Sequence, residues 1–106
     1  MAKPLVIADL RFDSQRAAIE HARRILYDGQ PGTRIADSDV PFVEALLCAR
    51  ADKTLDLHGL NVIAYCRDWQ DGPIKRTICF WAVLEDGTHV DFSFMKAIRL
   101  LAQDVP

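Results

Sequence analysis

Three side chains in the second half of the chain have the types and spacing that catalysis could use: Cys79, His89 and Asp91. A cysteine becomes a nucleophile at neutral pH only where a nearby base helps to form its thiolate. His89 and Asp91 are two residues apart, so on a strand they share one face and could act as a general acid/base pair. Same-face residues are more often surface partners or a cap for the next helix, and we favour the cap.

Metal and nucleotide sites are not indicated. No His-x-x-x-His, Cys-x-x-Cys or similar spacing joins any pair among His21, His58 and His89. The glycines form neither the GxGxxG pattern nor the Gly-Lys-Ser/Thr ending that cradles phosphate. We therefore expect no metal and no cofactor.

Cations close to aromatic residues suggest a binding surface. The residues in question are Arg67, Lys75 and Arg76 near predicted strand ends, Lys96 and Arg99 on the outer side of the last helix, and the aromatic Tyr65 and Trp69. Interleaved cations and rings suit stacking on bases or contact with a partner. The alternative is a solvated charged rim without a ligand.

Composition indicates one globular domain over residues 1–106. The chain has 106 residues, half of them hydrophobic, and a net charge of −2 that lacks the basic excess of many nucleic-acid-binding proteins. No apolar run reaches the roughly 18 residues that a membrane helix needs. Three cysteines, an odd number, favour reduced thiols over disulfides and hence the cytoplasm.

Periodicity predicts an α+β fold, with an antiparallel sheet of about three or four strands and three helices. A strand is expected at residues 5–7, followed by a helix over residues 15–27 capped by Asp13 or Ser14. A second helix should begin near Pro41 and end near Arg50, because proline is tolerated in the first turn. Strand alternation begins at Leu60, residues 69–73 form a turn, and the last helix follows a Ser93 cap.

A β-hairpin is expected at Asp86-Gly87, which suits a two-residue type I′ turn. In that register Glu85 opposes Thr88, and Trp81 opposes Phe92 on the core face. Cys79 then lies on the face opposite His89 and Asp91, so we expect a buried structural thiol and not a nucleophile.

Six segments of the chain resemble, in order and spacing, the pattern of the DeCL family, named for "defective chloroplasts and leaves". The segments are Arg11-Phe12-Asp13-Ser14, Ala22-Arg23-Arg24-Ile25-Leu26, Phe42-Val43-Glu44-Ala45-Leu46-Leu47, Ile78-Cys79-Phe80, Asp86-Gly87-Thr88 and Asp91-Phe92-Ser93-Phe94-x-Lys96-x-Ile98. The resemblance covers about residues 5–101 and is most specific in the final block. The chain departs from the pattern at Ile78, which replaces an arginine that could have gripped phosphate, at Ala97, which replaces a frequent cysteine, and at Cys48-Ala49-Arg50-Ala51, which replaces a frequent His-Pro.

The DeCL family has no established biochemical function, although its members include plant proteins implicated in chloroplast ribosomal RNA maturation and domains of plant-specific RNA polymerases. The resemblance therefore implies a non-enzymatic accessory module that contacts RNA or an RNA-handling complex, and it supplies no catalytic residues. The contacts expected are Lys75, Arg76, Lys96, Arg99 and Trp69. The first alternative is a protein-interaction domain that docks through Trp69, Tyr65 or the stripe of Arg16, Arg23 and Tyr27. An enzyme using Asp91 and His89 is the remaining one.

Overall fold

The computed structural model describes residues 4–103, so the first and last three residues of the predicted domain lie outside the described part. The chain begins with a small hairpin of β1 (Leu5–Ile7) and β2 (Leu10–Phe12), of which only β1 was predicted. Helix α1 (Gln15–Leu26) follows, and the Ser14 hydroxyl accepts a hydrogen bond from the Ala17 amide at 3.1 Å. Ser14 is thus the predicted N-cap.

The middle of the chain holds more helix than predicted. A short 3-10 turn (Asp37–Asp39) leads into α2 (Val40–Cys48), with proline in its first turn as expected. Arg50 then takes an extended conformation, which ends the helical run before α3 (Ala51–Leu55) begins. The predicted second helix therefore ends two residues early, and α3 was missed.

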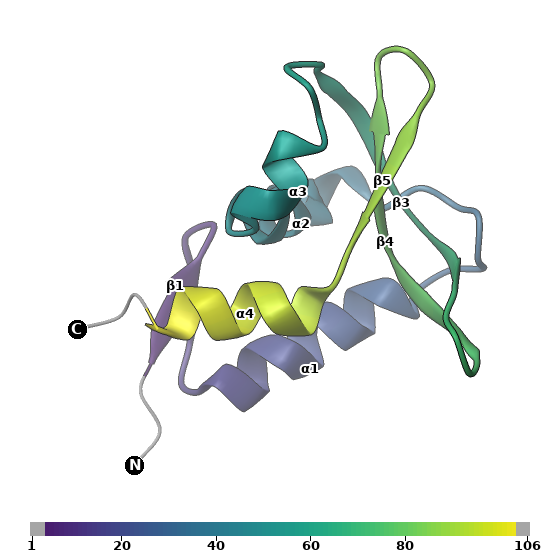
Figure 1. Ribbon diagram of the computed structural model, residues 1–106. Coiled ribbons are helices and arrows are strands. Elements are labelled where there is room, and N and C mark those ends of the chain that lie inside the picture. Colours follow the sequence, from purple (N-terminus) through teal and green to yellow (C-terminus); the bar gives the residue numbers. More distant parts are fainter. Residues whose placement is uncertain (1–3, 104–106) are drawn as a thin grey trace.

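The main sheet has three antiparallel strands in the order β3-β4-β5: β3 (Val62–Asp71), β4 (Arg76–Leu84) and β5 (His89–Phe92). Strand β3 extends further than predicted, and its turn with β4 spans residues 72–75 instead of 69–73. Helix α4 (Phe94–Gln103) follows β5 directly, and Ser93 caps it through a 3.4 Å hydrogen bond from the Lys96 amide. The fold is α+β, as predicted, with two antiparallel sheets and all four helices on one side of the main sheet (Figure 1).

The core lies between the main sheet and the helices. Phe80, Phe92 and Leu84 are almost completely buried on the sheet face that the helices cover. The helices contribute Ala18, Ala22, Leu26, Phe42, Val43, Leu46, Leu47, Ala97 and Ile98. Each large side chain buried in this way stabilises the fold by about 1.5–3 kcal/mol. None of the helices within residues 4–103 is long and apolar enough to cross a bilayer.

The register predicted for the β4–β5 hairpin is wrong by one residue. Phe80, not Trp81, opposes Phe92, and the Leu84 amide donates a hydrogen bond to the Thr88 carbonyl at 2.8 Å. A type I′ turn needs positive φ at both central residues, but here only Gly87 has it, at +88°. The loop accordingly contains Glu85, Asp86 and Gly87, and a one-residue slip reverses the face of every side chain on one strand relative to the other.

Candidate functional site

The corrected register brings Cys79 and Asp91 to the same face of the sheet, the one turned away from the core. Cys79 is nevertheless buried, and its burial, followed by the charge of Asp91, raises the pKa of the thiol to about 12. A thiol with that pKa does not form the thiolate that nucleophilic attack needs at neutral pH. Cys79 and Asp91 thus share a face, contrary to the prediction, and it is burial that makes Cys79 a structural thiol.

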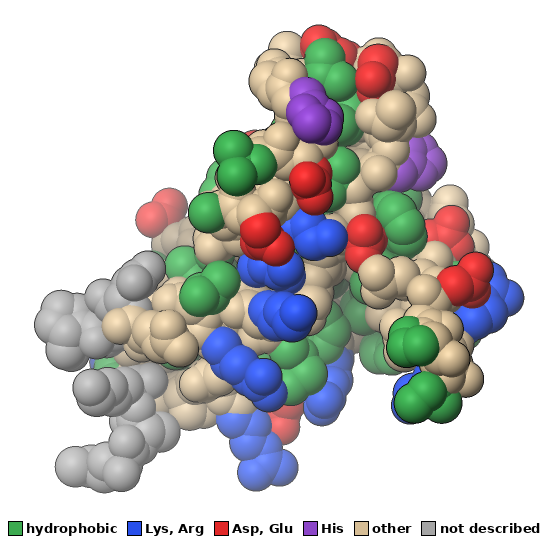
Figure 2. Space-filling model, viewed as in Figure 1, with side chains coloured by type: hydrophobic (Ala, Val, Ile, Leu, Met, Phe, Trp, Pro, Cys, Tyr) green, Lys and Arg blue, Asp and Glu red, His purple; other side chains and the backbone are tan. Residues whose placement is uncertain are grey.

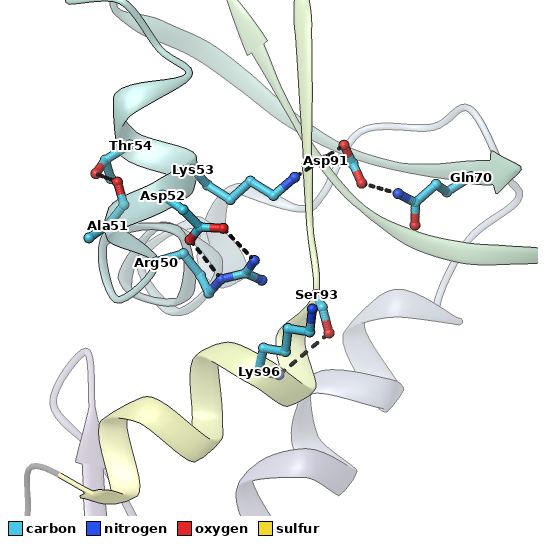
Figure 3. A network of polar contacts seen from close by, with 9 residues as sticks. All are labelled: Arg50, Ala51, Asp52, Lys53, Thr54, Gln70, Asp91, Ser93 and Lys96. Atoms are coloured by element: carbon cyan, nitrogen blue, oxygen red, sulfur yellow. Dashed lines mark hydrogen bonds and ion pairs between the residues drawn. The ribbon is translucent and has the colours of Figure 1, made fainter. Parts of the chain in front are cut away.

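Asp91 joins three elements and does not cap α4, which corrects the role that we favoured for it (Figure 3). One carboxylate oxygen lies 3.6 Å from the Lys53 ammonium of α3, and the other accepts a hydrogen bond from the Gln70 side-chain amide of β3. The cap is made by Ser93. Asp91 therefore ties α3 and β3 to the middle of β5.

His89 and Asp91 line a concave pocket of about 390 Å³ between the β4–β5 turn and the loop after α3. The whole lining, which we call the hairpin pocket, is Asp56, His58, Leu60, Asp86, Thr88, His89, Val90 and Asp91. Hydrogen bonds from Thr88 lower the pKa of Asp86, and the nearby charge of His58 adds to the shift. Lys96 is not among the residues that line this pocket.

The hairpin pocket is acidic, and sequence reasoning missed the part of it contributed by Asp56, His58 and Leu60. Its three aspartates would repel a phosphate group, and they suit a cation better than an anion. The sequence feature that could have indicated this segment is the pair His58-Gly59. Both residues adopt positive φ, at +51° and +78°. Within residues 4–103, no three His, Cys, Asp or Glu side chains form a group suited to a metal ion.

A row of basic side chains lies on another part of the surface, over α3 and α4 (Figure 2). We call Lys53, Lys96 and Arg99 the basic band; Arg50, the residue before α3, is only 6% exposed and does not belong to it. The Arg50 guanidinium donates two hydrogen bonds to the Asp52 carboxylate, at 3.0 and 3.2 Å. Lys53 forms an ion pair with Asp91. Lys96 and Arg99 are exposed, and neither makes an ion pair with any residue between 4 and 103. Helix α4 has no acidic residue among its ten.

The other predicted contact residues gather at the outer end of the β3–β4 hairpin. We call Trp69, Ile74, Lys75 and Arg76 the hairpin end. The Arg76 guanidinium lies over the Trp69 ring, 5.1 Å from its centre, and pairs with Asp71 at 3.1 Å. The fold thus divides the four predicted cations into two pairs, one on α4 and one at this turn (Figure 1).

Arg67 does not belong to either surface. It is only 4% exposed and lies on the core face of β3, so grouping it with cations at strand ends was wrong. Its Nη2 donates to the carbonyl of Ile25 at 3.0 Å, and its Nη1 donates to Thr33 Oγ1 at 3.1 Å. Arg67 fastens the end of α1 and the following loop to the sheet.

The family-motif residues divide in the same way between structural and surface roles. Cys79, Phe80 and Phe92 are buried, whereas Asp86 and Gly87 form the exposed turn. Asp91 and Ser93 are half-buried and bind Lys53 and the first turn of α4, respectively. Most of the motif residues therefore stabilise the β4–β5 hairpin and its connection to α4.

Comparison with known proteins gives a family and one solved fold. The family model described as "Protein of unknown function (DUF3223)" matches residues 23–98. The chain is similar to an uncharacterized protein from Rhodospirillum rubrum, known from a solution NMR structure, with 27% sequence identity and a TM-score of 0.77. That alignment covers 92% of this chain and 89% of the other. No curated protein matches the chain.

Proposed function

The chain belongs to the DUF3223 family of proteins of unknown function, and from this starting point we propose that it is a non-enzymatic binding module that contacts RNA. The observation that supports the proposal is the basic band. Lys96 and Arg99 are exposed, without ion-pair partners in the described part of the chain, on a helix that carries no acidic side chain. Phosphate groups are the ligands that such cations attract most strongly.

Charge is distributed unevenly, so a net charge of −2 is compatible with a local surface that attracts a polyanion. Aspartates and histidines gather around the hairpin pocket, while arginines and lysines gather over α4 (Figure 2). A polyanion is repelled by the first region and attracted by the second, so it approaches in one orientation. The resemblance to the DeCL family, with its links to ribosomal RNA maturation and transcription, favours RNA among the possible polyanions.

The test is binding of a fluorescein-labelled RNA, followed by anisotropy at low salt. Arg99→Glu should weaken binding on the order of tenfold, and Lys96→Glu/Arg99→Glu further, because each reversal removes a phosphate contact and adds repulsion. Arg34→Glu is the matched control, since it changes the net charge equally at an exposed residue outside the basic band. Equal losses for Arg99→Glu and Arg34→Glu, or no binding by the unaltered protein, would contradict the proposal.

The main alternative is a protein-interaction domain with no nucleic-acid contact. It is favoured by the apolar surface of the hairpin end, where Ile74 is 95% exposed and Trp69 is 42% exposed. A protein partner that stays bound after nuclease treatment and is released by Ile74→Asp would support this alternative. The third candidate is an enzyme built on Asp91 and His89, now within the hairpin pocket, and an Asp91→Asn variant that loses an assayable activity without unfolding would support it.

A further inference from the structure

The hairpin end faces the same side of the sheet as α4. In the β3–β4 ladder Trp69 pairs with Ile78, and Ile78 is two residues from Phe80 on the core face. Side chains two residues apart on a strand point to the same side. Trp69 therefore points toward the side occupied by the helices, but beyond the region that they cover.

Trp69 and Arg76 form the stacking surface of the hairpin end. The guanidinium lies 5.1 Å from the centre of the indole ring and also pairs with Asp71 at 3.1 Å. The ring is still 42% exposed, and Ile74 beside the turn is 95% exposed. Aromatic rings and guanidinium planes are the groups on which unpaired bases stack.

A series of neighbouring residues connects the stacking surface to the start of α4. Phe94, the first residue of α4, contacts Phe80 with a distance of 6.2 Å between ring centres. From Phe80 to Ile78, the partner of Trp69, the strand advances roughly 7 Å. Figure 2 shows the outer part of this hairpin standing apart from the body of the molecule, with a hollow between them. Lys75 lies in the β3–β4 turn, and Lys96 lies on the first turn of α4; both side chains are exposed.

We infer that the RNA bound by this protein is single-stranded, with its phosphates on Lys96 and Arg99 and an unpaired base stacked on Trp69 at the hairpin end. This inference rests on the proposed function and adds the form of RNA that is recognised. A duplex keeps its bases stacked on one another, so it can use the basic band but not the indole ring. Single strands should therefore bind more tightly than duplexes of equal length.

Tryptophan fluorescence tests the inference directly with a single-stranded uridine decamer as the probe. The chain has two tryptophans, so Trp81→Phe leaves Trp69 as the only indole. Quenching of Trp69 should saturate at the RNA concentration at which anisotropy saturates. Trp69→Leu should weaken binding about tenfold, whereas Trp69→Phe, which keeps a ring, should retain most of it.

Two further variants separate stacking from general effects on the fold. Ile74→Asp changes an almost fully exposed side chain, so it leaves the core intact and should weaken binding several-fold by placing a negative charge beside the stacked base. Ile63→Ala, at another exposed apolar residue, is the control and should bind like the unaltered protein.

The possible failures are distinguishable. If the decamer binds, is lost with Lys96→Glu/Arg99→Glu, but neither quenches Trp69 nor responds to Trp69→Leu, then the stacking inference is overturned and the proposed function stands. Equal affinity for the decamer and a duplex of the same length would also overturn it. If the unaltered protein binds no RNA, both proposals are overturned.

Discussion

At the scale of single residues, the least expected finding is a buried arginine that pairs with no carboxylate among residues 4–103. Arg67 directs its guanidinium at the last turn of α1, where the carbonyl of Ile25 accepts one of its hydrogen bonds. The C-terminal end of a helix carries a partial negative charge, which compensates the buried cation in part. Its Nε atom is buried without a hydrogen-bond partner among the described residues, so the site depends on the bonds that the guanidinium does make.

Gly29 should be required because Arg67 occupies the space that a larger side chain would need. A Cβ atom at position 29 would lie 2.0 Å from Arg67 Nη1 and 2.9 Å from Thr33 Oγ1. Gly29→Ala should therefore displace the guanidinium from its partners and lower the free energy of unfolding by about 2 kcal/mol, as measured by urea denaturation. In an Arg67→Met background the same alanine should cost much less. Equal costs in the two backgrounds would show that the clash is not the cause.

His21 should make the stability of the fold depend on pH. Its ring packs edge-on against Phe42, with centres 4.7 Å apart, and burial, followed by the charge of Arg24, lowers its pKa despite an opposing effect of Asp39. The unfolded chain then binds a proton at this histidine more readily than the folded one. The contribution of neutral His21 to the free energy of unfolding is therefore complete above pH ~6.5 and is lost as the pH falls through and below that value. Urea denaturation between neutral and mildly acidic pH should show the loss. His21→Phe keeps the aromatic packing and should flatten that slope, and an unchanged slope would rule His21 out.

At the scale of elements, the β4–β5 turn shows which of its features short sequence patterns predict. The Asp86-Gly87 signal correctly located the β4–β5 turn, but it did not determine the length of the loop. Asp86 accepts hydrogen bonds from both the amide and the hydroxyl of Thr88, at 3.0 and 2.6 Å, and only Gly87 adopts positive φ. The resulting three-residue loop decides that Phe92, not Asp91, enters the core beside Phe80.

Substitution in the β1–β2 turn should raise the stability of the fold, because residues 8 and 9 fit the backbone conformation of this turn poorly. Ala8 and Asp9 both have positive φ, at +51° and +68°, as in the turns that favour Asn-Gly. An alanine in this conformation costs roughly 1 kcal/mol, a cost that asparagine largely avoids. Ala8→Asn should therefore raise the thermal midpoint, followed by circular dichroism. Ala8→Val, which adds branching at Cβ, should lower it, and the same direction of change in both variants would contradict this explanation.

At the scale of the whole molecule, one sheet and one set of helices separate two kinds of surface. The hairpin pocket collects Asp56, Asp86 and Asp91 from two distant segments, while α4 presents Lys96 and Arg99 on a different face. The Lys53–Asp91 ion pair lies at the boundary between them. A net charge of −2 describes neither surface, which is why the overall composition said little about partners.

The sequence by itself determined the features that depend on neighbours along the chain. The apolar stripes of α1 and α4, the serine caps Ser14 and Ser93, the location of the β4–β5 turn and the α+β class all follow from spacing over a few residues. The tertiary structure alone decided the register of β5, the burial of Arg67 and the pairing of Asp91 with Lys53 and Gln70. These depend on contacts between residues far apart in the chain, where a slip of one position changes a core residue into a surface residue without altering any local pattern.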